Sequence, residues 1–130
     1  MSEFSSALSV LSSGMKSQGQ RLRHIAENVA NADTPGYRRK TVEFRAVFED
    51  GQKTGAVEPG RVRLDRKDLE QIHDPSHPMA DDRGYYLGSN VQLVTEIADA
   101  REAQRSYEAN MKMFMQVRRM SSALMDVLKR

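Results

Sequence analysis

The chain has 130 residues, of which 38% are hydrophobic, so its length fits one domain with extensions but its apolar content is thin for a globular core. Its 20 basic and 18 acidic residues are interspersed, whereas a nucleic-acid binder usually concentrates basic charge on one face. The chain contains no cysteine, which excludes disulfides, thiolate metal ligands and a cysteine nucleophile. We therefore expect another chain to cover part of the apolar surface.

The N-terminal sequence lacks the pattern of a secretory signal peptide. Glu3 stands where such a peptide carries positive charge, and serines interrupt the apolar stretch that follows it. No apolar run approaches the length that spans a membrane. We expect a protein that does not span a membrane and that, if it leaves the cytoplasm, uses a route without a cleaved signal peptide.

Residues 4–31 have the periodicity of an amphipathic helix. Their apolar residues recur at steps of four and three, which gives a narrow stripe of the coiled-coil type. The other faces carry many serines, including Ser17, together with Gly14 and Gly19, and both residue types are weak helix formers. Such a helix is marginal alone, so we expect it to need a partner.

The end of this helix is predicted to be a firm stop followed by a turn. Asn31 is a candidate C-cap residue, because asparagine tolerates the left-handed conformation. Thr34 precedes a proline and therefore favours an extended conformation. Pro35 and Gly36 suit the central positions of a type II turn, which would send Tyr37 onward in an extended state.

The middle of the chain differs in composition and holds all four prolines. Partial alternation of apolar residues predicts a strand or extended segment at 42–48 and a short strand at 62–64, with the conformation of 46–72 as a whole left open. Residues 73–84 are rich in turn-forming residues and are predicted to be non-helical. The middle is therefore expected to be small, without a core of its own.

A second helical period runs over residues 91–128. The predicted fold class is mainly α, with long N- and C-terminal helices paired as a coiled-coil-like hairpin and a short, partly β or extended middle segment. The predicted units are 1–31 (N-terminal helix), 32–90 (joint and middle) and 91–130 (C-terminal helix).

The motifs that carry chemistry are weak. Two histidines, His73 and His77, are four residues apart, but Pro75 and Pro78 exclude the helix on which they would share a metal. No nucleophile elbow surrounds a serine, and no glycine-rich phosphate loop occurs. The basic run 38–40 is interpreted as a solvated, salt-bridging face. We expect no catalytic site, no metal, no cofactor and no nucleic-acid partner.

Two stretches carry a resemblance to a known family. "ENVANADTPGYRRK", which follows the N-terminal helix, resembles the signature of the bacterial flagellar basal-body rod and hook proteins. "DPSHPMADDRGYYLGSNVQLVTEIADAREAQRSYEANMKMF" resembles the C-terminal part of a proximal rod protein, and the short length fits that group. One departure is Gly88-Ser89 before Asn90-Val91, where the family usually has a proline, and it is expected to loosen the start of the last helix.

The resemblance implies a structural role. Proteins of this family are exported through the flagellar type III apparatus without a cleaved signal, and they assemble in the periplasm into the rod that carries torque from motor to hook. The implied partners are other copies of the chain, other rod proteins, the adaptor between rod and MS ring, and the export apparatus. The terminal helices would form the inner tube of the rod.

Two groups of residues are the candidate functional residues. The helical periods predict an assembly seam, the set of residues expected to contact neighbouring subunits: Leu8, Leu11, Met15, Leu22, Ile25, Val29, Leu93, Ile97, Tyr107, Asn110, Phe114, Val117, Leu124 and Leu128. The turn signals predict a joint between the helix and the middle segment: Asn28, Asn31, Thr34, Pro35, Gly36 and Tyr37.

Three other interpretations stay open at this point. The chain is alternatively a free-standing coiled-coil adaptor, which would form a stable helical dimer by itself. It is alternatively a small nucleic-acid-binding protein that uses residues 38–40, which predicts a steep salt dependence. Within the rod family, the other short proximal rod protein is the alternative, although "EAQRSYEAN" disfavours it.

Overall fold

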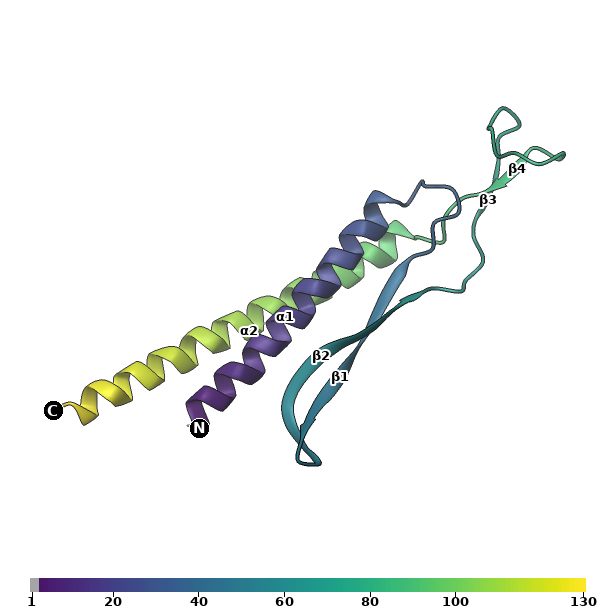
Figure 1. Cartoon of the computed structure of the whole chain (residues 1–130). Coiled ribbons are helices and arrows are strands. Elements are labelled where there is room, and N and C mark those ends of the chain that lie inside the picture. Colours follow the sequence, from purple (N-terminus) through teal and green to yellow (C-terminus); the bar gives the residue numbers. More distant parts are fainter. Residues whose placement is uncertain (1–2) are drawn as a thin grey trace.

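The computed structural model describes residues 3–130, so the first two residues of the predicted unit 1–31 lie outside the described residues. Two long helices flank a middle segment built of two β-hairpins (Figure 1). This confirms the expected order of a long helix, a β-containing middle and a longer helix. The elements are α1 (Glu3–Ala30), β1 (Lys40–Glu49), β2 (Gln52–Leu64), β3 (Gln71–His73), β4 (Tyr85–Leu87) and α2 (Leu93–Leu128).

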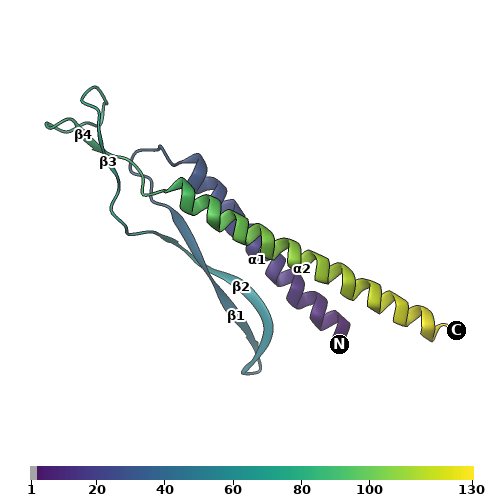
Figure 2. The same cartoon turned by 180° about the vertical axis from the view of Figure 1, so that it is seen from behind.

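The two helices lie side by side and run in opposite directions (Figures 1 and 2). At 1.5 Å per residue, α1 is about 42 Å long and α2 about 54 Å. The C-terminal end of α2 therefore extends past the N-terminal end of α1 (Figure 1). No helix among residues 3–130 combines the length and the apolar character that a membrane span requires.

Small residues bring the two helices together. Ser17 of α1 and Ala103 of α2 are 1% and 0% exposed. A Cβ added to Gly14 would lie 2.7 Å from Nδ2 of Asn110, so the backbone of α1 approaches that side chain closely. The expectation that Ser17 lies on an outer face is wrong, because the close approach of the helices encloses this small side chain.

The turn after α1 is present as predicted, but the helix ends differently. The backbone N–H of Tyr37 donates to the carbonyl of Thr34 at 3.2 Å, and Gly36 has a φ of +76°. Asn31 does not have the left-handed conformation, since its φ is not positive. Its Nδ2 instead donates to the carbonyl of Glu27 at 2.9 Å, which satisfies one free carbonyl at the helix end.

The two strands predicted in the middle are longer than expected, and they pair as a hairpin, which the sequence left open. Strands β1 and β2 pair antiparallel from Lys40 opposite Leu64 to Glu49 opposite Gln52. Asp50 and Gly51 connect them with positive φ values of 50° and 78°, which is the geometry of a type I′ hairpin turn. The hairpin lies along α1 (Figure 1).

The second hairpin, β3–β4, projects beyond the helices (Figures 1 and 2). Its long connection is non-helical, as predicted. The ring of His77 stacks on Tyr86 with a centroid distance of 3.8 Å, and the ring of His73 meets Tyr85 edge-on at 4.7 Å. Among residues 3–130, no three or more histidine, aspartate or glutamate side chains gather in a way that would hold a metal.

Candidate functional site

The point where α1, β1 and α2 meet contains a cluster of polar side chains, which we call the polar joint. It comprises Asn28, Tyr37, Arg39, Asp65, Asn90 and Glu96. These residues come from five separate parts of the chain, and their bonds close the end of the helix pair from which both hairpins leave.

Asn28 is the centre of the polar joint and is completely buried. Its Oδ1 accepts hydrogen bonds from the backbone N–H of Lys40 at 2.8 Å and from the hydroxyl of Tyr37 at 2.9 Å. Its Nδ2 donates to the carbonyl of Lys40 at 3.0 Å and to Oε2 of Glu96 at 3.3 Å. One amide therefore fixes the start of β1 to α1 and links both to α2.

Arg39 joins the start of β1 to three carboxylates. Its Nε lies 2.6 Å from Oε1 of Glu96, its Nη2 lies 3.2 Å from Asp99, and its Nη1 lies 3.4 Å from Asp65. The side chain of Glu96 is 0% exposed and that of Arg39 is 18% exposed. A buried carboxylate needs such a charged, hydrogen-bonded partner. Burial opposes the charge of Arg39, but the hydrogen bonds and charges of Glu96, Asp65 and Asp99 together outweigh it and raise the pKa of the guanidinium.

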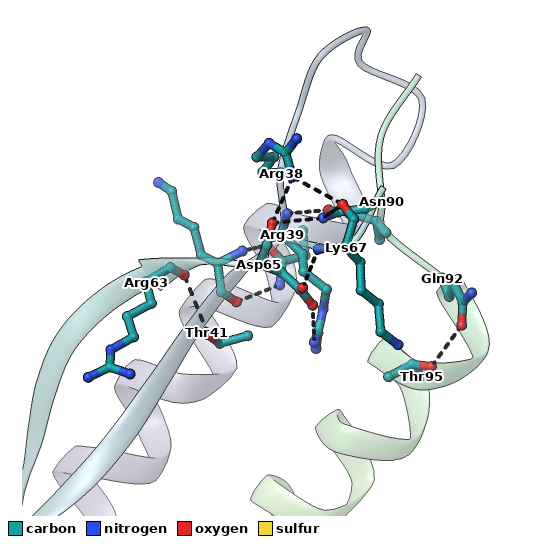
Figure 3. Close-up of polar contacts among 12 residues, drawn as sticks. Arg38, Arg39, Thr41, Arg63, Asp65, Lys67, Asn90, Gln92 and Thr95 are labelled. Atoms are coloured by element: carbon teal, nitrogen blue, oxygen red, sulfur yellow. Dashed lines mark hydrogen bonds and ion pairs between the residues drawn. The ribbon is translucent and has the colours of Figure 1, made fainter. Parts of the chain in front are cut away.

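Asn90 fixes the chain before α2 to the chain after β2. Its Oδ1 accepts the backbone N–H of Arg39 at 2.7 Å, and its Nδ2 donates to the carbonyls of Asp65 at 3.0 Å and Lys67 at 3.1 Å (Figure 3). The backbone N–H of Lys67 donates to Oδ1 of Asp65 at 2.9 Å. This bond, followed by the contact with Arg39, lowers the pKa of the Asp65 carboxyl.

The segment before α2 is anchored by side-chain bonds. Ser89 is 4% exposed, its hydroxyl donates to the carbonyl of Ala32, and its Oγ accepts the N–H of Val91 at 3.3 Å. The expectation that Gly88-Ser89 loosens this segment is wrong, because the serine supplies bonds that a proline side chain does not have. The helix itself begins at Leu93, two residues later than predicted.

An ion pair lies at the edge of the polar joint. The Nζ of Lys40 is 2.8 Å from Oε2 of Glu27, and this hydrogen bond lowers the pKa of the Glu27 carboxyl and raises that of the lysine. Burial raises the pKa of the Tyr37 phenol, so the hydroxyl stays protonated and donates to Asn28. The polar joint is thus held by complementary donors and acceptors, which suits fixation of chain segments.

The predicted joint residues divide into two groups. Asn28 and Tyr37 meet in the polar joint itself. Asn31 and Thr34 bond to each other beside it, with Oγ1 of Thr34 donating to Oδ1 of Asn31 at 3.1 Å. The backbone N–H of Gly36 donates to the carbonyls of Leu87 and Gly88, so the turn also contacts the chain that leads into α2.

The residues of the predicted assembly seam lie in three settings in the single chain. Ile25 is buried, and eight others are partly buried: Leu8, Leu11, Met15, Leu22, Tyr107, Asn110, Phe114 and Val117. The remaining five are exposed: Val29, Leu93, Ile97, Leu124 and Leu128. Contacts between subunits are not part of a single chain, so the assembly seam stays a prediction.

The sequence interpretation missed four members of the polar joint: Arg39, Asp65, Asn90 and Glu96. The basic run 38–40 was expected to be a solvated, salt-bridging face. At Arg39 the salt bridges are present, with three carboxylates, but the side chain is only 18% exposed, so its expected solvation is wrong. A signal for Glu96 was present in the helical period. Steps of three and four back from Asn110 pass Tyr107, Ala103 and Ala100. From Ala100 a step of three leads to Ile97, which is in the predicted assembly seam, and a step of four leads to Glu96, which lies on the same stripe.

Two family models match most of the helix pair and four of the six residues of the polar joint. The model described as "Flagella basal body rod protein" matches residues 5–38. The model described as "Flagellar basal body rod FlgEFG protein C-terminal" matches residues 82–127. The first match ends just after the turn that follows α1, and the second match begins in the connection between β3 and β4.

Curated relatives named flagellar basal-body rod protein FlgC match nearly the whole chain. The relative from Agrobacterium fabrum is 39% identical over 99% of this chain and 98% of its own length. Relatives from Salmonella typhimurium and Aquifex aeolicus are each 33% identical and cover 85% and 88% of the chain. At this identity and coverage, the chain belongs to the FlgC family of flagellar basal-body rod proteins.

Proposed function

We propose that this chain is a structural subunit of the proximal rod of the flagellum, and that it assembles by packing its terminal helices against neighbouring subunits. The observation that carries this proposal is the apolar surface of α2 that the chain does not cover itself. The large exposed apolar residues of α2 are Leu93, Val94, Ile97, Met111, Met113, Met115, Met120, Leu124, Met125, Val127 and Leu128.

The small core supports the same proposal. Among residues 3–130, the buried hydrophobic residues are Ile25 and Ala103. Burial of apolar area is the main favourable term in folding, so a chain with such a core gains stability when neighbours cover its helices. The methionines along α2 suit this role, because their flexible side chains adapt to non-identical surfaces.

We also propose a division of labour within the subunit. Residues 1–31 and 91–130 would form the inner, coiled-coil-like helix pair of the rod wall, and 32–90 would form an outer unit. The polar joint would connect the two units rigidly, so that torque applied to the helices reaches the hairpins. Short charge-assisted hydrogen bonds such as Arg39 to Glu96 suit a connection that must not bend.

The proposed partners are other copies of this chain, other rod proteins, the adaptor between the rod and the MS ring, and the flagellar type III export apparatus. Export without a cleaved signal peptide would bring the chain to the periplasm. A chain with few buried apolar residues can be kept unfolded for export and then ordered on assembly.

The proposal is tested at Leu124, which is 46% exposed in the single chain. Cells that lack their own copy of the gene would express Leu124→Asp or, as a matched control, Leu124→Met. The aspartate scarcely changes the isolated chain but buries an unpaired charge if a neighbour covers this position. We expect cells with Leu124→Asp to form no rods and not to swim. Cells with Leu124→Met should form rods and swim. Normal rods with Leu124→Asp would contradict assembly through this face.

A further inference from the structure

The base of the β1–β2 hairpin carries an open cleft of about 950 Å³ that the helix-packing proposal does not use. We call it the arginine cleft, and its lining is rich in positive charge. Besides Leu64 and Asp65, the residues that line it are Arg38, Thr41, Glu43, Arg61, Arg63 and Arg66.

Strand pairing collects these residues on one face of the hairpin. Thr41 of β1 stands opposite Arg63 of β2, and its hydroxyl donates to the arginine's carbonyl at 3.4 Å (Figure 3). The strand register shifts between Val42 and Phe44, so regular alternation does not extend past this point. Glu43 and Arg61 nevertheless line the same cleft, and Oε1 of Glu43 lies 4.0 Å from Nη1 of Arg63. The alternate position, where Val42 pairs with Val62, belongs to the opposite face.

The positive charge of the arginine cleft is not balanced within the described part of the chain. Arg63 has one acidic neighbour, Glu43, at 4.0 Å, and both side chains are mostly exposed. Arg61 and Arg66 are exposed and have no ion pair within 4.0 Å among residues 3–130. Asp65, which also lines the cleft, is already engaged by Arg39. The cleft therefore has free capacity for an anionic partner.

The chemistry of the lining favours carboxylates of a protein. A guanidinium presents paired donors that match a carboxylate or a phosphate. No aromatic side chain lines the arginine cleft, so bases of a single-stranded nucleic acid would find no stacking platform there. Arg38 is held in place by hydrogen bonds to the carbonyls of Asp65 and Lys67, each at 3.0 Å (Figure 3).

The chain itself carries an exposed acidic turn, residues 81–82, in the projecting β3–β4 hairpin (Figures 1 and 2). The turn is closed by the N–H of Gly84 donating to the carbonyl of Asp81 at 2.9 Å. The Oδ1 of Asp81 accepts the N–H groups of Arg83 and Tyr85, each at 2.9 Å. These bonds hold the turn in shape and leave Asp82 exposed at its corner.

We propose that the arginine cleft of one copy receives the acidic turn, residues 81–82, of a second copy. The two surfaces are different parts of the molecule, so the contact is head-to-tail and repeats from copy to copy in an assembly. The inference rests on the proposed function, because rod assembly brings copies next to each other. It adds a specific electrostatic contact outside the helices.

Cross-linking in assembled rods tests the contact, and the absence of native cysteine makes each introduced thiol unique. Cells would express two distinguishable copies, one with Arg61→Cys and one with Asp82→Cys. An arginine–aspartate pair holds its Cβ atoms too far apart for a disulfide, so a short bismaleimide is used. We expect a cross-linked dimer of the two copies. Lys53→Cys, on the same hairpin outside the cleft, replaces Arg61→Cys as the matched control and should give none.

Reversing charges on the two surfaces tests whether the arginine cleft and the acidic turn attract each other or only lie close together. In copies that carry the same cysteines, Arg63→Glu should lower the yield of the cross-link about twofold to fivefold at low salt, and less at high salt. In partner copies whose cysteine is placed at the neighbouring exposed Arg83 in place of Asp82, Asp82→Arg should restore the yield. Lys53→Glu, outside the cleft, should have no effect.

Three outcomes would overturn the inference. They are rods without the cross-link, a cross-link yield that is insensitive to Arg63→Glu, or binding of a poly-glutamate peptide to the cleft without any link between copies. In each of these cases normal rods and swimming would leave the proposed function intact. Failure of the unmodified chain to form rods in the same cells would instead overturn the proposed function.

Discussion

The Nε atom of Arg39 lies 2.6 Å from Oε1 of Glu96, and this pair joins residues 57 positions apart at the meeting point of β1 and α2. Removal of the guanidinium by Arg39→Ala leaves a buried carboxylate without its charged partner. We expect a loss of about 3 kcal/mol in the free energy of unfolding, because an unpaired buried charge is strongly destabilising. Urea unfolding followed by circular dichroism measures it.

The control for this variant is Arg101→Ala, which removes an exposed arginine from α2, the helix that carries Glu96. We expect a change within about 0.5 kcal/mol there. The double variant Arg39→Met with Glu96→Leu removes both charges and should recover most of the loss. Equal stability of Arg39→Ala and Arg101→Ala would mean that the pair does not hold the polar joint together.

Asn28 offers a second test of the polar joint. Asn28→Leu fills the space but leaves the hydroxyl of Tyr37 and the backbone N–H of Lys40 without their acceptor. Each buried group left without a partner costs about 1–3 kcal/mol, so we expect a loss of at least about 2 kcal/mol. Thermal melts of Asn28→Leu and of Ala26→Leu, an exposed position on the same helix, measure the difference. Equal melting temperatures would contradict a central role for Asn28.

The helices and the turn after α1 could be predicted because their signals are local. A period of three and four, and the pair Pro35-Gly36, act within a few residues. The length of the β1–β2 hairpin could not be predicted. Irregularities in the strand pairing at 42–44 and 46–48 break the alternation of apolar residues, and Pro59, a residue that argues against a strand, lies inside β2. The Asp50-Gly51 turn was the available signal for the hairpin.

The polar joint could be predicted only in part, for a physical reason. Asn28 and Tyr37 flank the turn signal and are close in sequence. Arg39 and Glu96 meet through the fold, and a charge in the sequence does not reveal whether it will be solvated or paired. The helical period of α2 helps to identify which charged residues become buried. Ala103 is buried, and Glu96, seven residues earlier, therefore lies on the same face of the helix, toward α1.

The carboxyls of Glu27 and Asp65 predict an acid-sensitive fold. Hydrogen bonds from Lys40 and from the N–H of Lys67, respectively, lower their pKa values in the folded chain from the ordinary 4.5 and 3.8. A carboxyl with a lowered folded pKa contributes stability above its ordinary value, and that contribution is lost as the pH falls through the folded pKa. We expect the melting temperature to fall as the pH drops below 4.5.

The variants Glu27→Gln and Asp65→Asn remove the two titrating groups. Their melting temperatures should be lower than that of the unmodified chain at neutral pH and should depend less on pH in the acid range. Glu3→Gln, at an exposed carboxylate at the start of α1, is the control and should keep the full acid dependence. An unchanged acid dependence in Asp65→Asn and Glu27→Gln together would exclude these two carboxyls as its source.

Gly60 is predicted to tolerate no side chain. A Cβ at this position would lie 2.8 Å from the backbone carbonyl oxygen of Glu43, which cannot move without distorting the hairpin. We expect Gly60→Ala to lower stability by about 1–3 kcal/mol, as overpacking does. Gly14→Ala is the matched control, because its Cβ meets only the movable amide of Asn110 and alanine favours a helix. If Gly60→Ala were as stable as Gly14→Ala, the close approach at Gly60 would be refuted.

The two ends of α2 are predicted to differ in protection from hydrogen exchange. Residues 96–110 pack on α1 and the polar joint, whereas the exposed residues 122–128 extend past the N-terminal end of α1 (Figure 1). Local opening of an unsupported helix end costs almost no free energy, so amides at 122–128 should exchange rapidly in the isolated chain. In assembled rods the same amides should become protected if neighbouring subunits cover Leu124 and Leu128 as proposed. Mass spectrometry of both samples measures this, with the amides of 96–110 as the internal control, and equal protection along α2 in the isolated chain would show that its overhanging end is stable without neighbours.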